Sequence, residues 1–226
     1  MQLSAIDLTE VRRDSDVPLR DQILRRCQLM LMSGQVEPGQ KLPLRPLAKR
    51  LDTSLMPVRD ALNRLVADGA LELSSSRTIQ VPVISNAQMI EICEIRTMLE
   101  GLATERATPN LTNDSIDRLE GYIRDMHDLL NAQDYDNYIL KHYSFHFTIY
   151  AAAGQPRLLN LIEIMWLQIG PWFRQKTEQA NLRGTPNIYH KEVVSALRAR
   201  DAVDARKNLE LDVMSIIRYL RQGAWD

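Results

Sequence analysis

The chain has 226 residues, enough for one large domain or two modest ones with buried cores. Hydrophobic residues make up 45% and charged residues 25%, which excludes a fibrous or intrinsically disordered chain. No stretch approaches the ~18 consecutive apolar residues of a membrane-spanning helix. The acidic start lacks the apolar core of a signal peptide. We therefore expect a cytoplasmic protein that does not contact a membrane.

Charge is unevenly distributed, although the net charge is only −1. Residues 18–82 hold ten Lys and Arg against six Asp and Glu, whereas residues 83–226 hold sixteen against nineteen. This asymmetry points to an anionic partner for the first portion alone. Cys27 and Cys93 match no metal or redox spacing, so we expect reduced, buried thiols.

Helices and a hairpin are predicted in quick succession in the first third of the chain. Residues 1–17 are polar and weakly patterned, and we expect a flexible arm there. A helix is predicted from residue 18 to Gly34, followed by short helices over 44–51 and 54–68, with Ser54 as N-cap of the second. Alternating apolar residues then predict a β-hairpin over 70–81.

This order of elements is that of a winged helix-turn-helix, which we assign to residues 18–83. In the second helix of the turn motif, Arg59 and Asn63 lie away from the apolar stripe, as does the tip at residues 53–56. Taken singly, Arg59 and Arg64 describe only a solvated helix face. Together with the basic bias and the order of elements they predict binding to double-stranded DNA.

The segment also resembles the DNA-binding domain of GntR-type bacterial regulators. The resemblance rests on PGQKL at residues 38–42 and on PVRDALNRL at residues 57–65. It implies that Arg45 and Arg59 contact the operator, supported by the turn near Ser54 and Met56, and that the wing enters the minor groove. The predicted DNA-binding residues are Arg45, Lys49, Ser54, Met56, Arg59, Arg77 and Thr78.

Two residues depart from the family pattern. Leu55 stands where an arginine is common, and Thr78 stands where the wing tip often has glycine. These departures bear on operator preference and on the contact that the wing makes.

The remainder, residues 84–226, is predicted to be an all-α antiparallel bundle. Gly170-Pro171 is expected to kink or break the fourth of its helices. The predicted helices are 85–108, 112–131, 134–153, 156–180, 186–200 and 202–222.

Four residues of this bundle are candidate metal ligands. His142 and His146 are four apart, on one helix face that also carries apolar residues. By itself the pair is read as core histidines satisfied by backbone or tyrosine hydroxyls. His190 and Asp212 also lie on apolar stripes, and three imidazoles with one carboxylate suit a divalent transition metal. Zinc is the first expectation, with Ni, Mn and Fe left open, and His127 is read as a surface residue.

The bundle resembles the FCD effector-binding domain of the FadR branch of the same family. This implies a homodimer that responds to a small molecule. In metal-binding members of that branch, the position of His142 is an aspartate and the last helix supplies a histidine. Here the acid and the imidazole are exchanged, which preserves the ligand inventory. The carrying residues are Ile95-Arg96 with Leu99-Glu100, Phe145-His146 followed by Ala152-Ala153-Gly154, His190 before Leu197, and Ala202 and Ala205 before Asp212.

Effector contacts are assigned to Arg96, Tyr143 and Arg174. Arg96 has two readings: an ion pair with Glu100 four residues on, or a bidentate clamp for an organic carboxylate beside the metal. Most aromatic residues nearby are expected to have a core role.

Together these patterns predict a ligand-responsive transcription factor. It would bind an inverted-repeat operator as a homodimer and act as a repressor that a small organic acid releases. Two alternatives remain open. One is a metal-free sensor of the same fold, and the other is a hydrolase using His142, His146 and His190. The second lacks a general base, because residue 143 is Tyr where HExxH zinc enzymes carry Glu. We expect no enzymatic activity.

Overall fold

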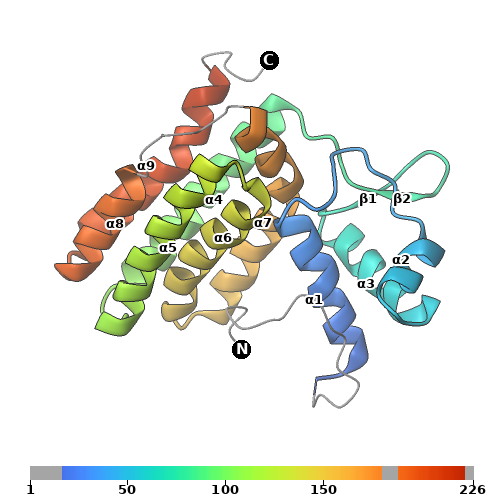
Figure 1. The fold of residues 1–226 in the computed structure, drawn as a ribbon, viewed down its shortest axis with the longest axis horizontal. Coiled ribbons are helices and arrows are strands. Elements are labelled where there is room, and N and C mark those ends of the chain that lie inside the picture. The colour runs from blue at the N-terminus through green and yellow to red at the C-terminus, as the bar shows by residue number, and fades with distance from the viewer. Residues whose placement is uncertain (1–16, 180–187, 222–226) are drawn as a thin grey trace.

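A computed structural model describes residues 17–179 and 188–221. Two parts are visible in Figure 1. The first contains three helices and a small sheet. These elements are α1 (Leu19–Met32), α2 (Leu44–Arg50), α3 (Leu55–Ala67), β1 (Glu72–Leu73) and β2 (Ile79–Gln80). We call them the winged part. The predicted arm lies almost entirely outside the described residues.

The winged part follows the predicted order, and its local signals explain why. Gly34, at φ 66°, ends α1 in a left-handed conformation that other residues adopt only with strain. Ser54 occupies the N-cap position of α3, but its side chain makes no capping hydrogen bond. β1 and β2 pair antiparallel, with Glu72 opposite Gln80. The strands are two residues each, so the hairpin is shorter than the predicted 70–81.

The second part, which we call the helical part, contains the remaining helices of the described chain. They are α4 (Asn86–Ala107), α5 (Asn113–Ala132), α6 (Tyr135–Ala152), α7 (Pro156–Gln179), α8 (Ile188–Arg198) and α9 (Ala202–Arg221). Ser85 caps α4 in a capping box with Gln88, and Asp134 caps α6. The predicted all-α bundle is confirmed.

One predicted feature of the bundle differs in part. Gly170-Pro171 was expected to kink or break the fourth helix, and α7 continues through Pro171 as one element, so the helix is not broken there. The flanking turns of α7 are held by packing on both sides. Ile169 and Trp172 lie in a buried apolar cluster, and Gly170 is pressed against α1. Tertiary contacts thus outweigh the local effect of proline.

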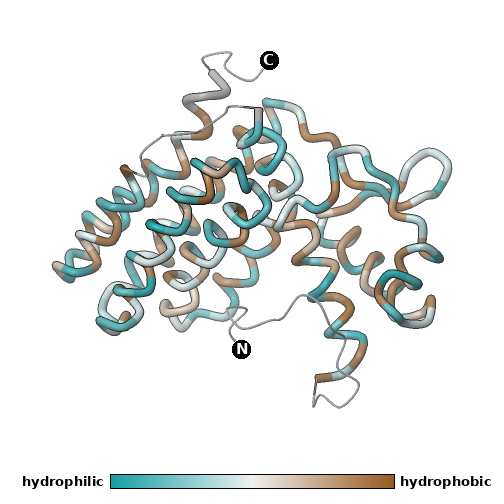
Figure 2. The backbone as a smooth tube through the Cα atoms, viewed as in Figure 1, coloured by the Kyte–Doolittle hydropathy of each residue, from teal (hydrophilic) through white to brown (hydrophobic). Residues whose placement is uncertain are grey.

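The helices of the helical part lie roughly side by side, with α4 against α6, α7 and α9. The tube in Figure 2 alternates between hydrophobic and hydrophilic residues along each helix, as expected of amphipathic helices around shared cores. The largest apolar cluster contains residues from both parts, including Ile23 of α1 and Ile162 of α7. No helix among the described residues is both long and apolar enough to cross a bilayer.

The two parts meet where α1 packs on α7. A Cβ added at Gly170 would lie 2.4 Å from the Leu31 carbonyl oxygen and 2.8 Å from Met32 Cα. Only glycine permits this approach of helix to backbone. Gln168, also on α7, donates through Nε2 to the carbonyl oxygen of Asp68 at 3.2 Å, and Asp68 is the C-cap residue of α3. α7 therefore holds both α1 and the end of α3.

Candidate metal centre and DNA-binding face

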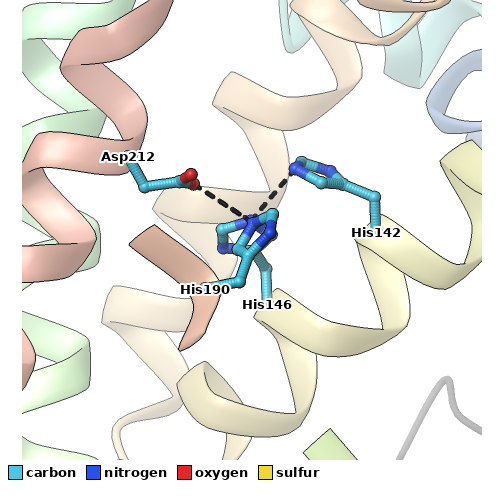
Figure 3. A group of neighbouring side chains, drawn as sticks. All are labelled: His142, His146, His190 and Asp212. Carbon is cyan, nitrogen blue, oxygen red and sulfur yellow. Dashed lines mark hydrogen bonds and ion pairs between the residues drawn. The ribbon is translucent and has the colours of Figure 1, made fainter. Parts of the chain in front are cut away.

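The structure brings the four predicted metal ligands together from three helices. α6 supplies His142 and His146, α8 supplies His190, and α9 supplies Asp212 (Figure 3). One potential ligand atom from each lies within 4.8 Å of all the others. The three histidines are buried and Asp212 is partly buried. Four donors separated by up to 70 positions in the sequence thus face one point.

The donors nearest to His146 are spaced as in a tetrahedral metal site, and the whole group lies within 4.8 Å. The Nε2 atom of His146 lies 3.2 Å from Nε2 of His142 and 3.3 Å from Nε2 of His190. The Oδ2 atom of Asp212 lies 3.5 Å from the Nε2 atoms of His146 and His190. Ligands about 2.0–2.1 Å from a tetrahedral zinc ion lie about 3.3–3.4 Å from one another. The residues present therefore fit a divalent ion.

The hydrogen bonds of His146 fix which nitrogen faces the centre. Its Nδ1 lies 2.8 Å from the hydroxyl of Tyr150, which donates its own proton to Oε2 of Glu100. The hydroxyl oxygen must therefore accept the proton on Nδ1, which leaves the lone pair of Nε2 directed at His142, His190 and Asp212. A carboxylate or hydroxyl behind a histidine is the usual support of a metal ligand.

The other two imidazoles have one side without a protein partner. The Nδ1 atoms of His142 and His190 are buried and make no hydrogen bond within the described part of the chain. Their Nε2 atoms instead point toward His146. Three imidazole Nε2 atoms so close together place lone pairs against one another, unless a proton or a cation lies between them.

Electrostatics favour the unprotonated, ligand-competent form of His142 and His146. Burial and then the like charge of His190 lower the pKa of His142 to about 3. The pKa of His146 is held well below its usual range, first by burial and then by His142 and His190. Burial opposes ionisation of Asp212, but the neighbouring imidazoles outweigh it and lower the pKa of this carboxyl. His142 and His146 thus present neutral nitrogens beside the carboxylate of Asp212, the forms that bind a metal.

Arg96 makes the predicted ion pair and keeps one free donor. Its side chain is 2% exposed, and Nε lies 2.7 Å from Oε1 of Glu100, with Nη2 3.4 Å from Oε2. Trp166 also donates to Oε1 at 2.8 Å, and the guanidinium lies 4.8 Å from the Trp166 ring centroid. That ring is 5.2 Å from the His146 ring. Nη1 of Arg96 is buried and has no hydrogen-bond partner among the described residues.

The two other predicted effector residues lie in different surroundings. Tyr143 is buried and stacked on Phe147 at 4.1 Å between ring centroids, and its hydroxyl finds no partner in the described chain. Arg174 was expected to share a cavity with Arg96, and this placement was wrong. Its guanidinium is paired with Asp136 at 3.0 Å and with Glu178. It lines a polar cleft of about 470 Å³ beside Gly34, and none of the histidines line that cleft.

The predicted DNA-binding residues lie on α2, α3 and the hairpin. Arg45 and Lys49 of α2, Ser54, Met56 and Arg59 at the start of α3, and Arg77 in the hairpin turn are exposed, whereas Thr78 is partly buried. The four cations of this set make no ion pair within the described residues. Unneutralised Arg and Lys side chains are available to DNA phosphates and bases. The structure thus leaves the predicted DNA-binding face open.

Two family models match the chain, one over each part. Residues 19–81 match the bacterial regulatory proteins of the gntR family, and residues 91–211 match the FCD domain. The HTH-type transcriptional regulator McbR of Escherichia coli K12 is 31% identical over 193 residues, covering 84% of this chain and 87% of McbR. The chain belongs to the GntR family of regulators with an FCD domain.

Solved structures and a second relative agree with this assignment. E. coli McbR/YncC superposes with a TM-score of 0.80 at 27% identity, covering 92% of this chain and 99% of that one. A GntR transcriptional regulator from Rhodococcus sp. RHA1 has the same fold, with a TM-score of 0.74 at 17% identity and the same coverage. The transcriptional repressor GlaR of E. coli K12 is 22% identical, covering 85% of this chain and 91% of GlaR.

Membership of this family establishes the general activity. The chain is a DNA-binding transcriptional regulator, and its relatives are regulators rather than enzymes. FCD domains bind metals in other proteins, and the group around His146 has the donors for one. The hydrolase alternative is therefore set aside.

Sequence reasoning missed the support behind the metal site. Tyr150 and Glu100 connect His146 to Arg96 through a continuous set of buried hydrogen bonds. The signal was present in part, because Tyr150 follows His146 by four residues and Glu100 follows Arg96 by four. What joins the two pairs is the packing of α4 against α6, which the sequence alone does not show.

Proposed function

We propose that this GntR-family regulator holds a divalent transition metal, zinc first among the candidates, through His142, His146, His190 and Asp212. The single observation that carries this proposal is the convergence of these donors at 3.2–3.5 Å around Nε2 of His146. Tyr150 supports it by directing the lone pair of His146 inward. A bound metal would supply a positive charge in a buried site, to which an anionic effector can bind.

Metal analysis of tag-free protein tests this site. Elemental analysis should find about one metal ion per chain, and His146→Ala should remove it. His127→Ala is the matched control, because His127 is an exposed histidine on α5. His142→Ala provides a second ligand variant in case one does not fold. Equal metal contents in the ligand variants and the control would refute the proposed ligand set.

We further propose that the effector is a small organic acid whose carboxylate is bound by Arg96 beside the metal. Nη1 of Arg96 is a buried donor without a partner among residues 17–179 and 188–221, and such a group is unfavourable unless a ligand satisfies it. Glu100 and Trp166 hold the guanidinium in place from the other side. A fixed guanidinium is well suited to a planar carboxylate.

A thermal-shift screen of small carboxylic acids, with and without added zinc, tests the effector class. Acids that bind should raise the melting temperature of the wild type, and more so with zinc present. Arg96→Lys keeps the charge that pairs with Glu100 but removes the fork of donors, so the shift should shrink while the fold is retained. Carboxylates that stabilise wild type and Arg96→Lys equally would argue against Arg96 as the clamp.

For DNA, we propose that residues 18–83 form the operator-binding domain and residues 84–226 the effector-binding and dimerisation domain. A homodimer would place one winged part on each half of an inverted-repeat operator in the cytoplasm. The name of the relative GlaR, a transcriptional repressor, supports repression that the effector relieves. The effector can change DNA affinity only by as much as its affinity differs between the two states.

Substitutions on α3 test the DNA-binding assignment. Arg59→Ala should weaken binding to a selected operator by about 1–3 kcal/mol, because Arg59 is exposed beside Met56 at the tip. Arg64→Ala is the matched control on the same helix, because its guanidinium is already paired with Asp68 at 3.2 Å. Binding isotherms that coincide for Arg59→Ala and wild type would remove Arg59 from the recognition set.

A further inference from the structure

The tip of α3 exposes two adjacent large apolar side chains. Leu55 is 39% exposed and Met56 is 63% exposed, and they are the first two residues of the helix. The apolar residues further along α3 are instead turned into the core, with Val58, Leu62 and Leu65 fully buried. Exposed apolar area on one side of a helix tip is unfavourable in water and favours a partner with an apolar group.

Helical spacing places Met56 on the DNA-facing side of α3. Met56, Arg59 and Asn63 follow one another at +3 and +7 along one stripe, and all are exposed. The opposite stripe carries the buried Val58, Ala61, Leu62 and Leu65. In a helix-turn-helix the second helix lies in the major groove, with its N-terminal residues on the base edges. Met56 is the apolar residue that this docking brings to the bases. Leu55, three residues before the buried Val58, lies at the edge of the buried stripe and is 39% exposed beside Met56 at the start of the helix.

The major groove offers one apolar group for them, the C5-methyl of thymine. Leu55 and Met56 have no side-chain N–H or O–H, so they cannot bond guanine O6 or N7 as an arginine does. The exposed cations Arg45 and Lys49 lie on the neighbouring helix α2 and suit the flanking phosphates, whereas Arg59 lies on α3 with the tip. Asp60 is the acid within α3, and it lies one turn beyond the tip.

We propose that Met56 and Leu55 form an apolar tip that contacts a thymine methyl group in each operator half-site. The tip therefore selects an A·T pair whose thymine methyl group faces α3. Leu55 is then a specificity-determining residue beside Met56. This inference rests on the DNA binding shown by the family and, for the two half-sites, on the proposed homodimer; it is independent of the metal and the effector.

The test removes single methyl groups from the DNA. Full-length protein first selects sequences from a random duplex pool, and each thymine of the selected half-site is then replaced by uracil. Replacement of one thymine in each half-site should weaken binding about fourfold per methyl group lost. In the double variant Leu55→Ala, Met56→Ala the thymine and uracil duplexes should bind equally.

Met98→Ala is the matched control, because Met98 of α4 is 62% exposed and lies in the helical part. It should preserve the wild-type ratio of thymine to uracil affinity, whatever its effect on overall affinity. The proposal is overturned if every uracil duplex binds the wild type as well as its thymine parent. It is also overturned if the uracil effect persists in the double variant, or if selection enriches no A·T pair. Failure of DNA binding itself differs from these outcomes, since no duplex would then be enriched.

Discussion

Substitution of Gly170 by alanine tests how the two parts are held together. A Cβ at this position would lie 2.4 Å from the Leu31 carbonyl oxygen, 2.8 Å from Met32 Cα and 3.0 Å from the Leu31 carbonyl carbon. All three atoms belong to the backbone of α1, so no side-chain rotation can relieve the contact. α1 would have to move away from α7, taking the rest of the winged part with it.

The expected change in the free energy of unfolding of Gly170→Ala follows from two opposing effects. Overpacking of this kind costs about 1–3 kcal/mol, whereas replacing a mid-helix glycine by alanine returns about 1 kcal/mol of helix propensity. Because the clashing atoms are backbone, we expect the upper half of the overpacking range and a net loss of about 1–2 kcal/mol. In a chain of this size such a loss lowers Tm by about 2–8 °C.

Gly121→Ala is the matched control, because Gly121 is also a helical glycine, on α5. A Cβ there would meet only Nη2 of Arg124, at 3.8 Å. This variant should gain about 0.4–1 kcal/mol. Thermal and urea unfolding of the two variants, followed by circular dichroism, give the comparison. If Gly170→Ala is stabilised as much as Gly121→Ala, the close contact between α1 and α7 does not determine how the parts pack.

Three further predictions concern the buried network. Tyr150→Phe removes the acceptor behind His146 and should reduce metal affinity about 10–100-fold in competition titrations, whereas Tyr122→Phe on α5 should not. Glu100→Gln leaves a buried guanidinium without its counter-charge and should cost about 3–5 kcal/mol in urea unfolding; the more exposed Glu105→Gln should cost less than about 1 kcal/mol. Removing the metal with a chelator should lower the Tm of the wild type, because free metal at 100 times its Kd stabilises the folded state by about 2.7 kcal/mol. The Tm of His146→Ala should not change. A similar Tm loss in that variant would contradict metal stabilisation.

Much of the fold was predictable because its signals are local. The apolar stripe of α3, with Leu62 and Leu65 buried, follows from 3.6-residue periodicity, which any amphipathic helix must show. Gly34 and Ser85 mark helix ends through backbone conformation and capping, which depend on a few neighbouring residues. The PVRDALNRL segment at residues 57–65 added a resemblance specific enough to indicate DNA binding from the amino-acid sequence alone.

The candidate site was predictable in its residue types but not in its construction. An imidazole or carboxylate on an apolar stripe must find a polar partner, so His146, His190 and Asp212 were recognisable as inward-facing polar groups. Periodicity reports which way a side chain points, but not which other helix lies opposite. The placement of Arg174 failed for this reason: it is one residue after Phe173, which contacts His142, and yet it faces Gly34.

By itself, then, the sequence determined the helices, the winged order of the first elements and the set of inward-facing ligands, because each depends on residues within a few turns. Tertiary structure alone decided that α6, α8 and α9 bring four donors within 4.8 Å, and that Tyr150 and Glu100 connect His146 to Arg96. It also decided that α7 continues through Pro171 while Gly170 contacts α1. These features arise where helices distant in sequence pack together, and no local pattern encodes which faces meet.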